Sequence, residues 1–142
     1  MARTRVRQLV PAAPEAVFAA FTDPEELRRW HAPGPDFRVP VAEFDARVGG
    51  RFRIAMQPPD REAPYTFGGV CREVKPGERL VYTSRWEPPE EPAESVVTIE
   101  LRPEGDATEV VVVQDGLPDD ASAASHTQGW TGTLESLVRH LA

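Results

Sequence analysis

The spacing of apolar and polar residues changes twice along the chain and predicts a different kind of segment each time. The first stretch alternates over residues 3–10, which predicts a strand that ends at Pro11. Two short helices are expected next, because two segments each carry proline and acidic residues in a first helical turn. The first of these helices starts at Pro14 and the second covers about residues 24–30. Residues 31–38 are expected to form a loop.

From residue 39 onward apolar and polar residues alternate again, so the spacing predicts strands. No helical pattern interrupts this part of the chain, and turns rich in glycine and proline separate the strands, so we expect an antiparallel meander. Gly68 and Gly69, inside one of the strands, predict a bend in the sheet. The predicted strands cover residues 39–45, 50–56, 65–74, 78–87, 95–102 and 108–114.

The last segment returns to helical spacing and predicts a helix over residues 119–141. One apolar stripe runs along it, made of Trp130, Leu134, Leu137, Val138 and Leu141. A helix of about 22 residues is ~33 Å long, close to the length of a ten-residue strand, so this helix can lie along the whole inner face of the sheet. The order of elements predicts an α+β fold, in which a curved antiparallel sheet of six to seven strands wraps around the C-terminal helix. Residues 1–142 are expected to form a single domain.

Composition and charge exclude several kinds of partner. The chain has 16 basic and 23 acidic residues, a net charge of −7, which argues against nucleic acid as a partner. Its longest apolar run, residues 16–21, is far shorter than the ~20 residues of a membrane-spanning helix, so we expect no membrane insertion. The N-terminus lacks the pattern of a secretory signal, and the single cysteine, Cys71, suits a reducing compartment. A cytoplasmic protein, monomer or homodimer, is the resulting expectation.

The meander places its longer connections together at one end. If the turns at 76–77 and 105–106 lie at one end of the sheet, the connections 57–64, 88–94 and 115–122 lie at the other, beside the start of the long helix. Side chains that point inward at this end would form a mainly aromatic pocket for a small molecule. The alternative is that the same side chains fill a core. The residues of this predicted pocket are Trp30, Phe37, Met56, Phe67, Tyr82, Trp86, Ser95, Gln114, His126 and Trp130.

The residues that could carry chemistry are few. The three histidines and the one cysteine have no metal-ligand spacing, and no nucleotide or cofactor motif occurs, so we expect no metal and no cofactor. His126 could act as a general base, but we favour a structural histidine near a helix start, bonded to a neighbour. Cys71 is expected to be a packed, inert thiol. The acidic run at 87–94 reads as a solvated loop that could act as a gate at the cavity mouth.

Several segments together resemble a known superfamily. They are Ala13–Phe18, Thr22–Leu27 with Trp30, Val48–Phe52, Glu78–Thr83, Gly116–Asp119 and His126–Trp130. In this order they resemble the SRPBCC superfamily, and within it the bacterial homologues of the C-terminal domain of the heat-shock-protein-90 ATPase activator (AHSA-type). The resemblance implies a START-like helix-grip fold with a hydrophobic cavity between the sheet and the long helix. It does not transfer a chemical activity.

Three functions remain open at this point. The leading one is non-enzymatic binding of a small hydrophobic or amphipathic molecule in that cavity. The resemblance also suggests an interaction protein that activates a chaperone ATPase in a stress response. A third possibility is an enzyme similar to polyketide cyclases, in which Tyr82, Gln114 and His126 orient a substrate.

Overall fold

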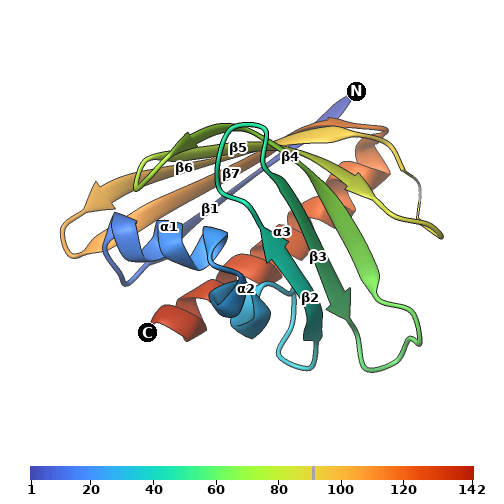
Figure 1. Cartoon of the computed structure of the whole chain (residues 1–142), viewed down its shortest axis with the longest axis horizontal. Coiled ribbons are helices and arrows are strands. Elements are labelled where there is room, and N and C mark those ends of the chain that lie inside the picture. The colour runs from blue at the N-terminus through green and yellow to red at the C-terminus, as the bar shows by residue number, and fades with distance from the viewer. Residues whose placement is uncertain (91) are drawn as a thin grey trace.

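Seven strands and three helices follow one another in the expected order (Figure 1). The computed structural model describes residues 1–90 and 92–142. Glu91, which belongs to the predicted acidic loop, lies outside the described residues. The elements are β1 (Ala2–Val10), α1 (Pro14–Thr22), α2 (Pro24–Trp30), β2 (Arg38–Phe44), β3 (Arg51–Gln57), β4 (Tyr65–Lys75), β5 (Arg79–Trp86), β6 (Ser95–Glu104), β7 (Ala107–Leu117) and α3 (Asp120–Leu141).

The strands form one antiparallel sheet in the order β1-β7-β6-β5-β4-β3-β2. Strands β2 to β7 are the predicted meander, and β1 adds to its free edge by pairing with β7. Strands β6 and β7 extend two to three residues beyond their predicted ends. The reason is that their ladder continues to Glu104 and Ala107, and that Leu117 still pairs with Ala2 of β1.

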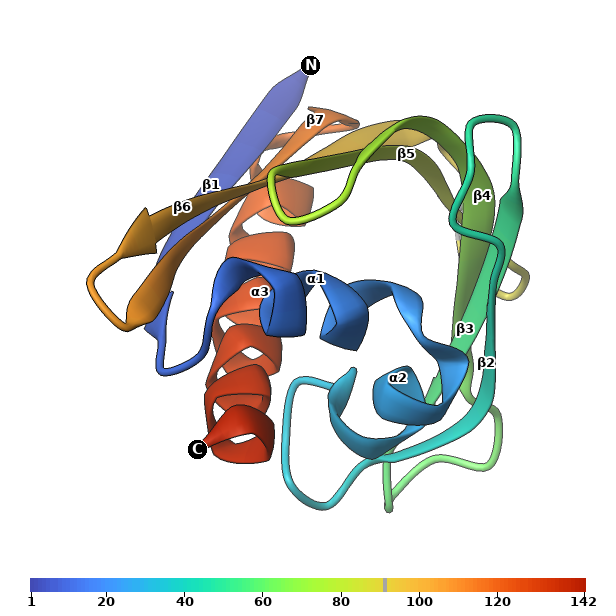
Figure 2. The same cartoon turned by 60° about the vertical axis from the view of Figure 1, so that its left-hand side comes forward.

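The sheet curves strongly, and Figure 2 shows its two halves folded around the helices. The glycine pair in β4 lies where neighbouring backbones approach closely. A Cβ atom at Gly69 would lie 1.9 Å from the carbonyl oxygen of Thr83, and one at Gly68 would lie 2.5 Å from that of Phe52. The amide of Val70 donates to the side-chain oxygen of Thr83 at 2.9 Å. Only residues without a side chain permit this close approach at the bend.

The three helices share the concave face of the sheet. Helix α3 packs mainly on β1 and β7, whereas α2 packs on β2 and α1 contacts β6 and β7. The expectation that α3 would lie along the whole inner face is therefore wrong. The short helices lie beside α3 on the same face (Figure 2), and apolar side chains of their own, such as Phe21 and Leu27, are buried.

Helices α2 and α3 each begin after an aspartate whose side chain caps the first helical turn. The carboxylate of Asp23 accepts from the amide of Glu25 at the start of α2, and that of Asp119 accepts from the amide of Ser122 at the start of α3. These bonds satisfy backbone donors that the first helical turn leaves free. Within residues 1–90 and 92–142, no helix is both long and apolar enough to cross a membrane.

Candidate functional site

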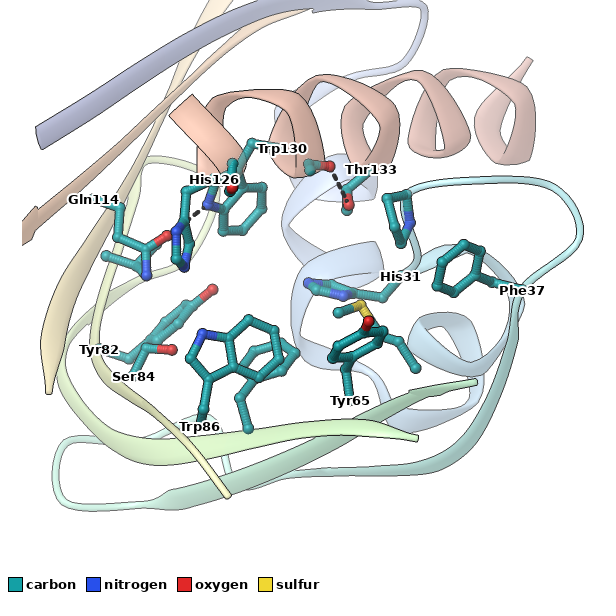
Figure 3. Close-up of a pocket in the computed structure, with 16 residues that line it drawn as sticks. His31, Phe37, Tyr65, Tyr82, Ser84, Trp86, Gln114, His126, Trp130 and Thr133 are labelled. Atoms are coloured by element: carbon teal, nitrogen blue, oxygen red, sulfur yellow. Dashed lines mark hydrogen bonds between the residues drawn. The ribbon is translucent and has the colours of Figure 1, made fainter. Parts of the chain in front are cut away.

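A cavity of about 400 Å³ lies between the sheet and α3 (Figure 3). Helix α3 and the connection 31–37 form one side of it, and strands β3 to β7 form the other. Aromatic rings and a small number of polar groups make up most of its wall, which is typical of small-molecule sites. The lining residues are His31, Pro33, Phe37, Met56, Tyr65, Phe67, Tyr82, Ser84, Trp86, Val97, Gln114, Ser125, His126, Gly129, Trp130 and Thr133.

Most of the residues predicted for the pocket lie around this cavity. Eight of them line it, namely Phe37, Met56, Phe67, Tyr82, Trp86, Gln114, His126 and Trp130. The structure places Trp30 and Ser95 elsewhere. The indole of Trp30 is buried in the core beside the cavity and donates to the carbonyl oxygen of Ala20 at 2.9 Å. Contact between any of these side chains and a ligand stays a prediction.

The predicted set omitted several lining residues. Ser84 and Val97 alternate correctly with their predicted neighbours, so strand parity could have found them. Thr133 lies three residues after Trp130 and shares its helix face. The close approach at the glycine pair hid the orientation of Tyr65. His31 lies in a connection where apolar residues show no regular spacing. Its position next to Trp30 was the one feature of the sequence that indicated a place near the pocket.

A buried chain of hydrogen bonds connects α3 to three strands. The indole of Trp130 donates to the amide oxygen of Gln114 at 2.8 Å. The amide nitrogen of Gln114 donates to the hydroxyl of Ser95 at 2.8 Å, and this hydroxyl lies 3.4 Å from the carbonyl oxygen of Ser84. Ser95 therefore supports Gln114 from behind the cavity wall. The network fixes the orientation of both Gln114 and Trp130 at the cavity.

His31 lies among aromatic rings. Its ring centroid is 5.0 Å from that of Trp30, 5.7 Å from that of Phe67 and 6.0 Å from that of Trp130. The residue is only 4% exposed. Burial lowers the pKa of the imidazole to about 4, so His31 is uncharged at neutral pH.

The other cavity histidine is tied to its own helix. Nδ1 of His126 donates to the carbonyl oxygen of Ser122, one turn earlier in α3, at 2.8 Å. This geometry confirms a histidine near the helix start that is bonded to a neighbour. It also leaves Nε2 without a proton in the neutral ring. Trp86 lies beside the ring, with 6.2 Å between centroids.

The two remaining groups that could ionise near the bend stay protonated. Burial raises the pKa of the Tyr82 phenol, so this side chain can act as a hydrogen-bond donor in the cavity. Burial also raises the pKa of the Cys71 thiol, which is 1% exposed and lies 3.7 Å from the carbonyl oxygen of Asp45. Cys71 is therefore the packed, inert thiol that we predicted.

The acidic connections do gather at one end, as predicted. Arg61 bonds to Glu90 at 2.8 Å, and a second pocket, of about 290 Å³, lies between residues 84–95 and 117–126. However, none of the described residues of 57–64, 88–94 or 115–122 lines the main cavity, so the expectation that these loops border it is wrong. Three residues line both pockets and stand between them, namely Ser84, Trp86 and His126.

The described residues offer no metal site. Among them, no group of three or more histidine, cysteine or acidic side chains is close enough to hold an ion. The polar groups at the cavity can donate or accept hydrogen bonds.

A curved antiparallel sheet that grips a long C-terminal helix, with a cavity between them, defines a helix-grip domain of the SRPBCC superfamily. Within that class, the chain belongs to the family described as "Activator of Hsp90 ATPase homolog 1-like protein", which matches residues 11–142. The resemblance seen in the sequence is thereby confirmed.

Several solved structures share this fold over nearly the whole chain. Protein CV1439 from Chromobacterium violaceum is 31% identical, with a TM-score of 0.87 over 99% of this chain and 98% of that chain. The AHSA1 protein from Silicibacter pomeroyi is 28% identical, with a TM-score of 0.86 over 99% and 97%. The AHSA1-like protein from Aeromonas hydrophila is 24% identical, with a TM-score of 0.80 over 98% and 91%. The comparison with curated proteins gives no match.

Proposed function

We propose that this domain binds a small hydrophobic or amphipathic molecule in the cavity between the sheet and α3, without catalysing a reaction. One observation carries the proposal, namely a cavity of about 400 Å³ whose wall is mainly apolar and rich in aromatic rings. Cavities of roughly 300–1,000 Å³ with apolar walls and a few polar groups are typical of small-molecule sites.

Native mass spectrometry of the protein purified from its own host tests this proposal. We expect a retained small molecule, seen as an added mass that disappears on denaturation. The variant Ser84→Phe would place a ring in the cavity and should abolish the added mass. Thr131→Phe, on the exposed face of α3, adds the same ring outside the cavity and should retain it. Equal retention by both variants, or no added mass in the unchanged protein, would contradict ligand binding in this cavity.

A second candidate is an enzyme similar to polyketide cyclases. The observation that favours it is that Tyr82, Gln114 and His126 line the same cavity and that the Nδ1 bond of His126 leaves Nε2 as the acceptor of the neutral ring. If a substrate is found, His126→Ala should abolish its turnover while the thermal unfolding of the domain stays cooperative. Turnover that is unchanged in this variant would remove His126 from the role.

A further inference from the structure

We propose that the cavity selects an uncharged, ring-containing molecule, and that an oxygen of this molecule accepts a hydrogen bond from Nε2 of His31. This inference rests on the proposed function and names the chemical class of the ligand. Two independent observations carry it. One is that the described wall contains no aspartate, glutamate, lysine or arginine, and the other is a buried histidine, His31, whose Nδ1 has no hydrogen-bond partner among the described residues.

The described wall of the cavity contains no aspartate, glutamate, lysine or arginine. Charged side chains outside this wall form ion pairs. Arg61 pairs with Glu90, for example, and Arg53 with Glu87. A carboxylate or ammonium group in the cavity would lose its water and find no lysine, arginine, aspartate or glutamate in the described wall to pair with. An uncharged ligand avoids this cost, and rings suit a wall built from Phe37, Phe67 and the two tryptophans.

The polar groups around the cavity differ in how many of their donors and acceptors are already hydrogen-bonded within the protein. Thr133 donates its hydroxyl proton to the carbonyl oxygen of Gly129 at 2.8 Å, and Gln114 bonds to both Trp130 and Ser95. His126 is bonded through Nδ1 to its own helix. In contrast, Nδ1 of His31 is buried and makes no hydrogen bond of normal geometry with the described residues, although buried polar groups are rarely left unpaired.

The burial of Nδ1 determines how the neutral ring can act. A buried N–H group without an acceptor is less tolerated in proteins than an acceptor without a donor. We therefore assign the single proton of the neutral ring to Nε2, the nitrogen at the tip of the side chain. Figure 3 shows the ring of His31 pointing into the cavity, across from Trp86 and Tyr82. Its neighbours Trp30, Phe67 and Trp130 hold the ring in this orientation.

Three naphthalene probes of similar shape test the inference by equilibrium dialysis at pH 7.5. They are 2-acetylnaphthalene, which offers a neutral oxygen acceptor, 2-naphthoate, which is an anion, and 2-isopropylnaphthalene, which has no polar group. We expect 2-acetylnaphthalene to bind at least about a hundredfold more tightly than 2-naphthoate, because the anion finds no partner. His31→Phe keeps a ring among the aromatic neighbours but removes the donor. It should weaken 2-acetylnaphthalene binding about tenfold and leave 2-isopropylnaphthalene binding unchanged.

Two further variants complete the test. His31→Gln keeps an N–H donor and should restore most of the affinity for 2-acetylnaphthalene, which also serves if His31→Phe does not fold. His140→Gln changes a histidine that lies outside the cavity, bonded to Glu26 at 3.1 Å, and should change no affinity. If all three probes bind with similar affinity, or if the substitutions at residue 31 leave the binding of 2-acetylnaphthalene unchanged, this inference fails and the proposed function stands. If no probe binds, the proposed function fails with it.

Discussion

At the scale of single residues, the cavity wall combines paired and unpaired polar groups. Gln114 was predicted to point inward from strand parity alone, and it does. Its bonds to Trp130 and Ser95 could not be predicted, because they depend on the rotation of α3 relative to the sheet, which spacing within one element does not define. The sequence could not predict that Nδ1 of His31 lacks a hydrogen-bond partner either, because this depends on all the residues that surround it in the folded chain.

The buried His31 predicts a pH dependence of stability for the ligand-free protein. Its pKa is about 4 in the folded protein, against an ordinary value of 6.5. Between these two pH values the unfolded chain binds a proton that the folded chain does not, so the free energy of unfolding falls as the pH falls from 6.5 toward 4. From pH 7 to pH 5, this one group should lower the stability by about 2 kcal/mol.

Urea unfolding of the unchanged protein and of His31→Gln at both pH values measures this effect. The variant cannot take up the proton at position 31, so the difference between the two proteins isolates it from the titration of the carboxylates. An equal loss of stability in both proteins would show that His31 does not carry the effect.

At the scale of elements, the packing of α3 depends on one of its two glycines. A Cβ atom at Gly132 would lie 2.2 Å from the carbonyl oxygen of Pro33, whereas one at Gly129 would meet nothing within 4 Å. The connection 31–37, which contributes His31 and Phe37 to the cavity, therefore lies directly against the backbone of α3. The sequence predicted the helix itself, but not this contact, because both glycines look alike in the helical pattern.

The two glycines predict opposite effects of the same substitution. Gly132→Ala should lower the free energy of unfolding by about 1–2 kcal/mol, because the backbone of the connection must move. Gly129→Ala should raise it by about 0.5–1 kcal/mol, because alanine favours the helix and meets no neighbour. Chemical denaturation of the two variants makes the comparison. A similar gain in both would mean that the connection is not held against α3.

At the scale of the whole molecule, the sequence predicted the class of fold well, because each change of period coincides with a real change of element. It predicted the position of α3 poorly. All three helices pack on the same concave face of the sheet, and the spacing of apolar residues does not define which part of that face each helix covers. The loops expected to border the cavity were misplaced for the same reason. Residues of the connection 31–37 and of 125–129 in α3 line the cavity, whereas none of the described residues of the acidic loops does.

The family match starts at residue 11 and so leaves β1 outside. Yet β1 pairs with β7 along its whole length and packs against α3. We therefore expect a chain that starts at residue 11 to lose cooperative folding, because α3 would lose its main strand contact and β7 would become an exposed edge. Thermal unfolding followed by circular dichroism checks this, with Arg5→Ala on the exposed face of β1 as the control. A cooperative transition near that of the full chain would contradict it.

The different surroundings of the three tryptophans have an optical consequence. Trp30 and Trp130 are buried, so their emission is expected at short wavelength. Trp86 is half-buried at the boundary between the two pockets and is the most exposed of the three indoles, so it is the one that water reaches most easily. The red side of the protein's emission band therefore belongs mainly to Trp86. A guest that displaces that water would shift the band toward the blue, so the protein contains its own fluorescent reporter of occupancy.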